Sequence, residues 1–218
     1  DAAQHLVTLD PVAVELIDNT MLDLARSIAL FRPTVEKYIR GQPAAILVVE
    51  FAENEEVENT RRLPALEAMM ADLGFGWEKK AGFTGGTVIL TEESDQARIS
   101  EMRKSGLNIM MSMKTSAKPV SFVEDCAVAL PDLAEYTEKL TSIFTKYKTT
   151  GTWYAHASVG CLHVRPILDM KNSNDVAAMR KIAEEAFQLV RDYRGSHSGE
   201  HGDGISRSEF NEVMFGKK

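Results

Sequence analysis

Apolar residues in the first forty positions recur at the spacing of one helix face, i, i+3, i+7 and i+10, which predicts a helical N-terminal extension. These residues are Val14, Ile17, Met21 and Leu24. After a break at residues 41–43 (GQP), the pattern changes. Residues 44–52 (AAILVVEFA) and 85–93 (GGTVILTEE) are short β-rich runs, which predict strands.

Four longer segments combine helical periodicity with residues that begin or end helices. They are residues 54–75, 94–111, 131–147 and 173–195. Pro64 inside the first segment predicts a kink or a restart, because proline lacks the amide hydrogen that a helix interior needs. Ser94 is the expected N-cap of the second helix, and Pro131 lies in the first turn of the third. Ser173 and Gly195 are expected to cap and close the last.

Two further segments complete the predicted sheet. Residues 121–130 (SFVEDCAVAL) predict a strand, and residues 152–168 (TWYAHASVGCLHVRPIL) alternate around a central glycine, which predicts a β-hairpin. Because a hairpin interrupts the alternation of helices and strands, the predicted fold class is α+β, with an antiparallel or mixed sheet and helices packed on one face. No repeat or linker divides the chain, so a single domain over residues 1–218 is expected.

The composition is that of a globular protein, and it narrows the classes of function. A net charge of −7 argues against nucleic-acid binding, which needs a basic face. The basic pairs Arg61-Arg62 and Lys79-Lys80 are expected to be solvated surface. The two cysteines are too few for a disulfide framework or an iron–sulfur cluster within this chain, and they fit a reducing cytoplasm. No apolar run approaches the about 20 residues of a membrane-spanning helix.

The predicted hairpin carries two of the five histidines. If Val159-Gly160 is a two-residue turn, His156 lies directly opposite His163. Opposed residues have Cβ atoms about 4.5–5.5 Å apart on the same face, so the two imidazoles can bind one divalent ion. The alternative is a pair of histidines that stack on the surface.

A glycine-rich loop, residues 195–204 (GSHSGEHGDG), holds the second candidate group. Glu200 and His201 are adjacent and would point to opposite sides of an extended backbone. One of the two can therefore complete a metal site with the histidine pair, while the other faces a substrate. Two histidines and one glutamate leave coordination positions open, as catalytic sites do. The flanking glycines would let a cofactor approach the backbone; they are Gly199, Gly202 and Gly204.

Together, HASVGCLH and SGEHGDGISRSEF resemble the C-terminal (cap) domain of FAD-linked oxidases, the glycolate oxidase and D-lactate dehydrogenase group of the vanillyl-alcohol oxidase superfamily. AAILVVEFA, MRKSGLNIMM, KPVSFVEDCAV and GTWYAHASVGCLHVRPILDMK extend the resemblance over most of the chain. They look like the subgroup that carries flavin and iron–sulfur modules in one polypeptide. The resemblance implies a ferredoxin-like cap whose antiparallel sheet lies over the isoalloxazine ring of FAD.

The resemblance also implies roles for individual residues. His156, His163 and Glu200 would bind a divalent metal, Zn or Mn. His201 would be the catalytic base that removes the hydroxyl proton of a 2-hydroxy acid, of the D-lactate or glycolate type, as hydride leaves C2 for flavin N5. An imidazole is a base suited to near-neutral pH, and activity is expected to fall as His201 becomes protonated.

Three basic residues are the candidates for substrate binding. Arg103 matches the position at which the family holds the substrate carboxylate, and a guanidinium suits that task. Lys118 is a second candidate of the same kind. Arg165, where some relatives carry asparagine, adds positive charge that would favour a dicarboxylate or a bulkier acid. The first motif also departs from the family pattern His-x-Gly-Asp-Gly-Asn-x-His, which leaves the identity of the substrate open.

No glycine-rich FAD-binding segment is found in the sequence. The chain is therefore expected to be a cap domain cut from a longer protein, whose N-terminal domain holds most of the FAD and which carries an iron–sulfur cluster elsewhere. That FAD domain and a small 2-hydroxy acid are the expected partners, and an exposed sheet edge makes a homodimer a further expectation. The expected location is the cytoplasm, with the full-length protein free to associate peripherally with the inner membrane.

Two alternative functions stay open at this point. One is a stand-alone zinc-dependent hydrolase that uses the same two histidines and glutamate, with His201 as base. The other is a non-catalytic α/β module in which the histidines are incidental.

Overall fold

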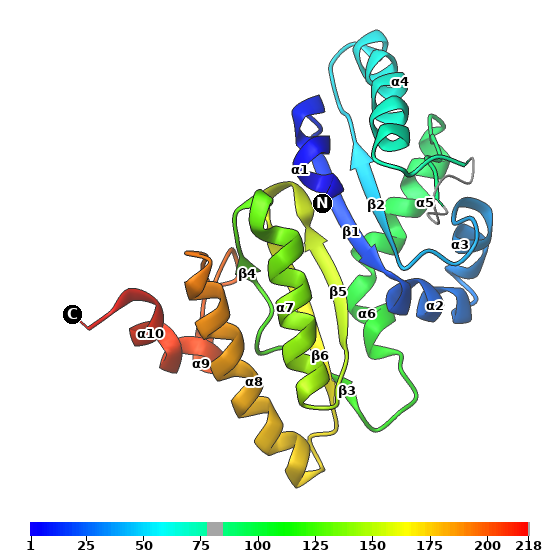
Figure 1. Cartoon of the computed structure of the whole chain (residues 1–218). Helices are drawn as coiled ribbons and strands as arrows, with labels where there is room; N and C mark the ends of the chain where they lie inside the picture. The colour runs from blue at the N-terminus through cyan, green and yellow to red at the C-terminus, as the bar shows by residue number, and fades with distance from the viewer. Residues whose placement is uncertain (78–84, 218) are drawn as a thin grey trace. The chain divides into compact units, whose positions relative to one another are not determined.

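The computed structural model describes residues 1–77 and 85–217, which form two compact units, Asp1–Ser112 and Met113–Lys218 (Figure 1). Each unit combines helices with antiparallel strands, which confirms the predicted α+β class. The single domain predicted for residues 1–218 stays a prediction. The predicted solvated pair at positions 79 and 80 lies outside the described residues.

The first unit is built on two antiparallel strands, β1 (Ala13–Asp18) and β2 (Ala45–Glu50), and β2 confirms a predicted strand. Val14 of β1 lies opposite Val49, and Val14 and Ile17 are fully buried. The helices of this unit are α1 (Ala2–Leu6), η1 (Val7–Leu9), α2 (Asn19–Ser27), α3 (Arg32–Tyr38), α4 (Glu56–Asp72), α5 (Glu93–Lys104) and α6 (Gly106–Met111).

The helical N-terminal extension is wrong over residues 13–18, which form β1. Of the four apolar residues at helical spacing, two lie in this strand and two in α2. The carboxylate of Asp18 separates the two elements, because it accepts the backbone N–H of Met21 at 2.8 Å and caps α2. The spacing therefore continues across a strand and a helix by coincidence.

Residues 85–92 contain no strand, although the run GGTVILTEE predicts one. β-branched residues favour strands only where a neighbouring strand is present to pack and pair with them, and no described strand pairs with this segment. The helix before it, α4, is confirmed, and it runs through Pro64 without a restart.

The helix predicted over residues 94–111 is two helices, α5 and α6, which meet at Ser105. Because α5 already begins at Glu93, Ser94 is not its N-cap. Within the described ranges, every helix is too short or too polar to cross a membrane.

The second unit is built on the antiparallel hairpin of β5 (Gly151–His156) and β6 (Cys161–Leu168), which confirms the predicted hairpin. Two short strands, β3 (Lys118–Pro119) and β4 (Cys126–Ala127), also pair antiparallel with β6. Its helices are η2 (Leu130–Asp132), α7 (Leu133–Lys146), η3 (Ala157–Val159), α8 (Ser173–Asp192), α9 (Gly204–Arg207), η4 (Ser208–Phe210) and α10 (Asn211–Phe215).

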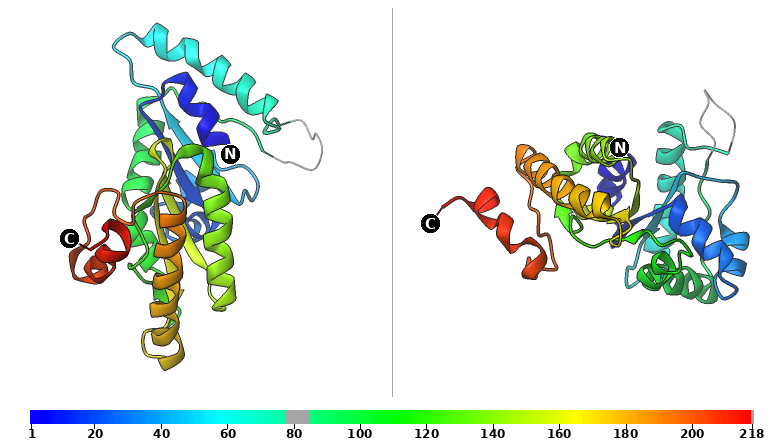
Figure 2. Two further views of the ribbon diagram at one scale, coloured as in Figure 1. Left: turned by 60° about the vertical axis from the view of Figure 1, so that its left-hand side comes forward. Right: turned by 90° about the horizontal axis from the view of Figure 1, so that it is seen from below.

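Helices α7 and α8 lie side by side against one face of this hairpin (Figures 1 and 2). Trp153 of β5 packs on Phe144 of α7, with ring centroids 5.9 Å apart. Successive strand side chains point to opposite faces, so the face away from Trp153 carries the polar set. Its members include Thr152, Tyr154, His156, Cys161, His163 and Arg165.

Of the strand predicted over residues 121–130, only β4 forms. Asp125, just before it, takes a left-handed φ of 76°, which interrupts an extended backbone. The predicted helix 131–147 is confirmed as α7, with Pro131 in the 3₁₀ turn that precedes it.

Helix α8 is also confirmed, with two corrections at its ends. It begins at Ser173, but the N-cap is Asn172, whose side chain accepts a backbone N–H of the first turn at 2.9 Å. It ends at Asp192, and Arg194 rather than Gly195 takes the left-handed conformation, with φ 54°. A side chain at Gly195 would instead collide with the carbonyl oxygen of Ala127 in β4.

Candidate metal centre

The two hairpin histidines lie on the same face of the sheet, but they are not directly opposed as predicted. His156 lies opposite Cys161, and His163 lies opposite Tyr154. The connection is four residues long, 157–160, rather than the two-residue turn assumed in the prediction. The loop is longer than predicted by two residues, an even number, so both side chains stay on the same face of the sheet. The histidines become diagonal neighbours instead of directly opposed ones. Their ring centroids are 4.9 Å apart.

Gly160 determines this connection. It takes a left-handed φ of 68°, and a Cβ at this position would collide with the carbonyl oxygen of Val128. Its own carbonyl oxygen accepts the backbone N–H of Val128 at 3.1 Å. Glycine is required here both for the conformation and for the close approach of the neighbouring chain.

The glycine-rich loop runs beside β4 and β6 and brings Glu200 to the histidine pair. Ser196 forms a β-bridge with Ala127, and the Gly199 N–H donates to the Asp125 carbonyl oxygen at 2.7 Å. A Cβ on Gly199 would lie 2.9 Å from the Cys161 sulfur. The absence of a side chain at Gly199 therefore lets the loop lie against the strands.

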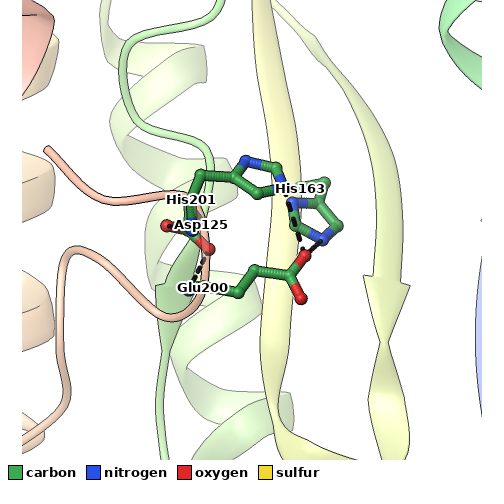
Figure 3. A group of neighbouring side chains, drawn as sticks. All are labelled: Asp125, His163, Glu200 and His201. Atoms are coloured by element: carbon green, nitrogen blue, oxygen red, sulfur yellow. Dashed lines mark hydrogen bonds and ion pairs between the residues drawn. The ribbon is translucent and has the colours of Figure 1, made fainter. Parts of the chain in front are cut away.

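The carboxylate of Glu200 is the centre of the site (Figure 3). Its Oε1 lies 2.9 Å from Nε2 of His163 and 3.4 Å from Nε2 of His156. The same oxygen lies 3.2 Å from Nε2 of His201. Two imidazoles from the hairpin and one from the glycine-rich loop thus converge on one carboxylate oxygen.

The expectation that His201 points away from Glu200 is wrong. The loop bends at this point rather than continuing as extended backbone, so both side chains reach the same space. The His201 ring stacks on His163, with centroids 4.8 Å apart and an interplanar angle of 15°. Its Nδ1 lies 3.7 Å from a carboxylate oxygen of Glu124.

The surroundings of His163 favour the neutral form of its imidazole. Burial and the neighbouring charge of His156 hold the pKa of His163 below its usual value. A neutral imidazole is the form that binds a metal. Its Nδ1 is buried without a hydrogen-bond partner, whereas its Nε2 faces Glu200.

The donor set fits a divalent cation. Ligands bound at about 2.0–2.1 Å lie roughly 2.9 Å apart at octahedral angles and roughly 3.4 Å apart at tetrahedral angles. Within the predicted ligand set, Nε2 of His163 and Nε2 of His156 lie 2.9 and 3.4 Å from Glu200 Oε1, which falls in that interval. Possible ligand atoms of Asp125, His163, Glu200 and His201 lie within 4.8 Å of one another. Imidazole nitrogens and carboxylate oxygens are both common ligands of divalent metals, and the identity of the metal stays a prediction.

The three basic residues predicted to bind the substrate each have a different partner in the structure. Arg165 lies two residues beyond His163 and forms an ion pair with Glu124, at 2.6 Å. The Lys118 ammonium donates to the carbonyl oxygen of Met113. Arg103 belongs to the first unit, where it pairs with the buried carboxylate of Glu15 at 3.0 Å. A role in substrate binding stays a prediction for all three basic residues.

The flanking glycines have local explanations. Gly199 allows close packing against Asp125 and Cys161, while Gly202 and Gly204 take left-handed φ values of 73° and 52°. Their assignment to cofactor binding stays a prediction.

Three buried charged residues beside the site were not predicted as parts of it: Glu124, Asp125 and Arg207. The sequence contains one signal that points to two of them. Adjacent acids inside a segment otherwise apolar enough to be read as a strand (SFVEDCAVAL) require partners if they are buried. Arg207 carries no such signal, because its charged partner, Asp125, is 82 residues away in sequence.

Comparison with known proteins decides the family. The family model for the C-terminal domain of FAD linked oxidases matches residues 1–218. The chain belongs to this family.

The FAD linked oxidase domain described here is similar to parts of larger proteins. It is 30% identical over 220 residues to the D-2-hydroxyglutarate dehydrogenase of Escherichia coli (strain K12), covering 99% of this chain and 21% of the relative. The D-2-hydroxyglutarate dehydrogenase of Haemophilus influenzae is 29% identical over 216 residues, with 98% and 21% covered. Glycolate oxidase subunit GlcD of Bacillus subtilis (strain 168) is 26% identical over 223 residues, with 100% and 43% covered. The chain thus spans about a fifth of the length of these two dehydrogenases.

Proposed function

We propose that this chain is the metal- and substrate-binding part of an FAD-dependent dehydrogenase that oxidises a 2-hydroxy acid. The observation that carries the proposal is the convergence of three imidazole Nε2 atoms on Glu200 Oε1, at 2.9–3.4 Å, within a domain of the FAD linked oxidase family. The names of the similar proteins, a hydroxyglutarate dehydrogenase and a glycolate oxidase subunit, support 2-hydroxy acids as the substrate class.

His156, His163 and Glu200 would hold the divalent ion. When bound, the ion would polarise the substrate hydroxyl and carboxylate, and FAD, held mainly by another domain, would accept the hydride from C2. The two histidines come from paired strands, so their separation is fixed by the hydrogen-bonded hairpin. Glu200 comes from a loop and is 45% exposed, which leaves the side of the site facing solvent open to a substrate.

His201 would act as the base that takes the hydroxyl proton. Its side chain is 45% exposed, compared with 8% for His163, so it is the more accessible of the two stacked imidazoles. Its Nδ1 lies 3.7 Å from a Glu124 carboxylate oxygen, and its Nε2 lies 3.2 Å from Glu200 Oε1. Binding of the Glu200 carboxylate to a metal ion would leave Nε2 available to accept the hydroxyl proton. The same Glu124 binds Arg165, so a guanidinium is held close to the proposed base.

Arg165 would bind a carboxylate of the substrate. It retains N–H donors beyond those directed at Glu124, because a guanidinium has five. A second carboxylate, as in a 2-hydroxy dicarboxylic acid, would find a cation two residues from His163 on the same sheet face. A stand-alone hydrolase has no comparable support, since family membership links the chain to flavin oxidases.

Metal binding tests the centre directly. The wild-type chain should retain about one equivalent of Zn or Mn after gel filtration, whereas Glu200→Gln should weaken its affinity at least about 10–100-fold, because it removes an anionic ligand. Glu209→Gln is the matched control, since Glu209 is a glutamate in the same C-terminal segment that pairs with Arg180. Isothermal titration calorimetry gives both affinities. A wild-type chain that binds no metal, or equal affinities in the two variants, contradicts the proposal.

The base is tested in a complete polypeptide that also contains the FAD domain. His201→Gln should lower kcat by about 10²–10⁴-fold with the metal content unchanged, because a general base contributes on that order. Bleaching of the flavin by a 2-hydroxy acid gives the rate, and elemental analysis gives the metal content. Loss of metal in this variant would make His201 a ligand instead of the base.

A further inference from the structure

We infer that Asp125 is a positioning residue of this site: its carboxylate holds the backbone of Glu200 and His201 in place before any metal binds. The inference rests on the proposed metal centre and identifies the residue that makes the loop ready to bind. Asp125 is fully buried, although it is ionisable and lies in a connecting segment.

Both carboxylate oxygens of Asp125 accept backbone hydrogen bonds from the two functional residues. Oδ1 accepts the N–H of Glu200 at 2.8 Å, and Oδ2 accepts the N–H of His201 at 2.9 Å. Two consecutive amides are thus bound by one side chain, in the way that an anion is bound by successive N–H groups. This arrangement fixes the direction in which the Glu200 side chain leaves the loop.

The backbone of Asp125 joins the same loop to the sheet that carries the histidines. Its N–H donates to the carbonyl oxygen of Leu162 in β6 at 2.6 Å, next to His163. Its carbonyl oxygen accepts the N–H of Gly199 at 2.7 Å. One residue therefore links the strand of His163 to the loop of Glu200 and His201 through four hydrogen bonds.

The guanidinium of Arg207 lies beside the buried carboxylate of Asp125 and balances its charge. The guanidinium of Arg207, itself only 4% exposed, lies 3.4 Å from Oδ2 and also donates to the carbonyl oxygens of Glu124 and Gly202. Burial by itself would raise the pKa of the Asp125 carboxyl. The N–H groups of His201 and Glu200 outweigh it and hold that pKa below its usual value.

Asp125 lies close enough to the imidazoles to be considered a metal ligand, since its oxygens are within 4.8 Å of possible ligand atoms of His163, Glu200 and His201. Two observations favour positioning instead. Each of its oxygens already accepts a backbone N–H within 2.9 Å, and the imidazole Nε2 atoms converge on Glu200. A ligand would need to give up or share those hydrogen bonds.

The first test needs no substitution and no metal. In the metal-free wild-type chain, hydrogen exchange followed by NMR should show the Glu200 and His201 amides protected at least about 10-fold, relative to the adjacent amide of Gly202. The reason is that both N–H groups are bound by a buried carboxylate. Exchange at the rate of an unstructured loop would overturn the inference, whatever the outcome for metal binding.

The second test uses Asp125→Asn, which keeps the shape but replaces one acceptor oxygen with a donor. That NH₂ must face a backbone N–H, so one of the two hydrogen bonds is lost. Exchange at Glu200 and His201 should accelerate, and the Kd for Co²⁺ should rise about 10–100-fold, the usual effect of losing a partner of a ligand. The visible spectrum of bound Co²⁺ should keep its shape, because the ligands are unchanged.

Asp175→Asn is the matched control. Asp175 is another aspartate of the same unit that accepts a backbone N–H, from Asp169 at 2.8 Å, away from the site. This variant should leave both the exchange at Glu200 and the Co²⁺ affinity unchanged. A changed Co²⁺ spectrum in Asp125→Asn would make Asp125 a ligand, and unchanged affinity would make it merely structural. Failure of the wild type to bind Co²⁺ would refute the proposed metal centre and leave the exchange test to decide on Asp125.

Discussion

His197 is the histidine of the glycine-rich loop that takes no part in the metal site. It is fully buried, packs on Phe187 with ring centroids 5.2 Å apart, and has Nε2 3.1 Å from a carboxylate oxygen of Asp203. The other charged groups that act on it are Arg207 and Asp125. Burial lowers its pKa despite the attraction of Asp203, so His197 is a core residue that joins the loop to the C-terminal segment.

This burial predicts a dependence of stability on pH. Since the pKa of His197 is lower in the folded chain than the about 6.5 of an unfolded one, the unfolded state binds the proton first as the pH falls. The free energy of unfolding should therefore decrease below about pH 6.5, by at most about 1.4 kcal/mol per pH unit from this residue. Urea unfolding of the wild type and of His197→Gln measures it. Equal pH slopes in the two proteins would contradict the assignment.

At the residue scale, the sequence predicts the candidate metal ligands better than the residues that hold them in position. His156, His163 and Glu200 could be grouped because their spacing and type point to a metal. Asp125 could not be assigned, since its importance depends on a left-handed backbone and on a loop more than 70 residues away that binds its carboxylate. Its position inside a predicted strand concealed this role.

At the scale of elements, the hairpin determines whether the histidines meet. A side chain at Gly160 would collide with the Val128 carbonyl oxygen and would also require a left-handed conformation. Gly160→Ala should therefore lower the free energy of unfolding by about 2–5 kcal/mol. It should also weaken metal binding, because the pairing of the two strands that carry His156 and His163 begins at this turn.

The matched control for this prediction is Val159→Ala, one residue earlier in the same connection. Val159 is 68% exposed, and truncation of such a side chain should change stability by no more than about 0.5 kcal/mol. Urea unfolding and calorimetric metal titration of both variants make the comparison. Similar behaviour of the two would show that the turn does not control the site.

Elements with strong local signals were predicted correctly, and those that depend on partners were not. The amphipathic helices α7 and α8 and the hairpin carry their pattern within their own sequence. In contrast, β1 looks helical because its spacing continues into α2, and the residues 85–92 look extended and β-rich yet have no described strand beside them. Strand formation is a property of pairs of segments, so a single segment does not determine it.

At the scale of the whole molecule, the sequence resemblance to FAD-linked oxidases is confirmed, whereas the division into two compact units was not foreseen. The candidate centre lies within one of them: His156, His163, Glu200 and His201 all belong to Met113–Lys218. Arg103 lies in the other unit, paired with Glu15. We therefore expect the second unit to bind the metal through its own residues.

The 218-residue chain should therefore bind metal without oxidising a substrate. The chain spans 21% of the hydroxyglutarate dehydrogenases that it resembles, and the chemistry proposed here needs FAD as hydride acceptor. The purified 218-residue chain should bind one divalent ion yet show no flavin absorbance and no oxidation of a 2-hydroxy acid. A polypeptide that also contains the FAD domain should show both, and treatment with a chelator should then reduce its kcat/KM, with recovery when Zn or Mn is restored. Turnover by the chain alone would contradict these roles, since the substrate would be oxidised without the flavin as hydride acceptor. Full activity after metal removal would contradict them too, since the hydroxyl would be activated without the metal.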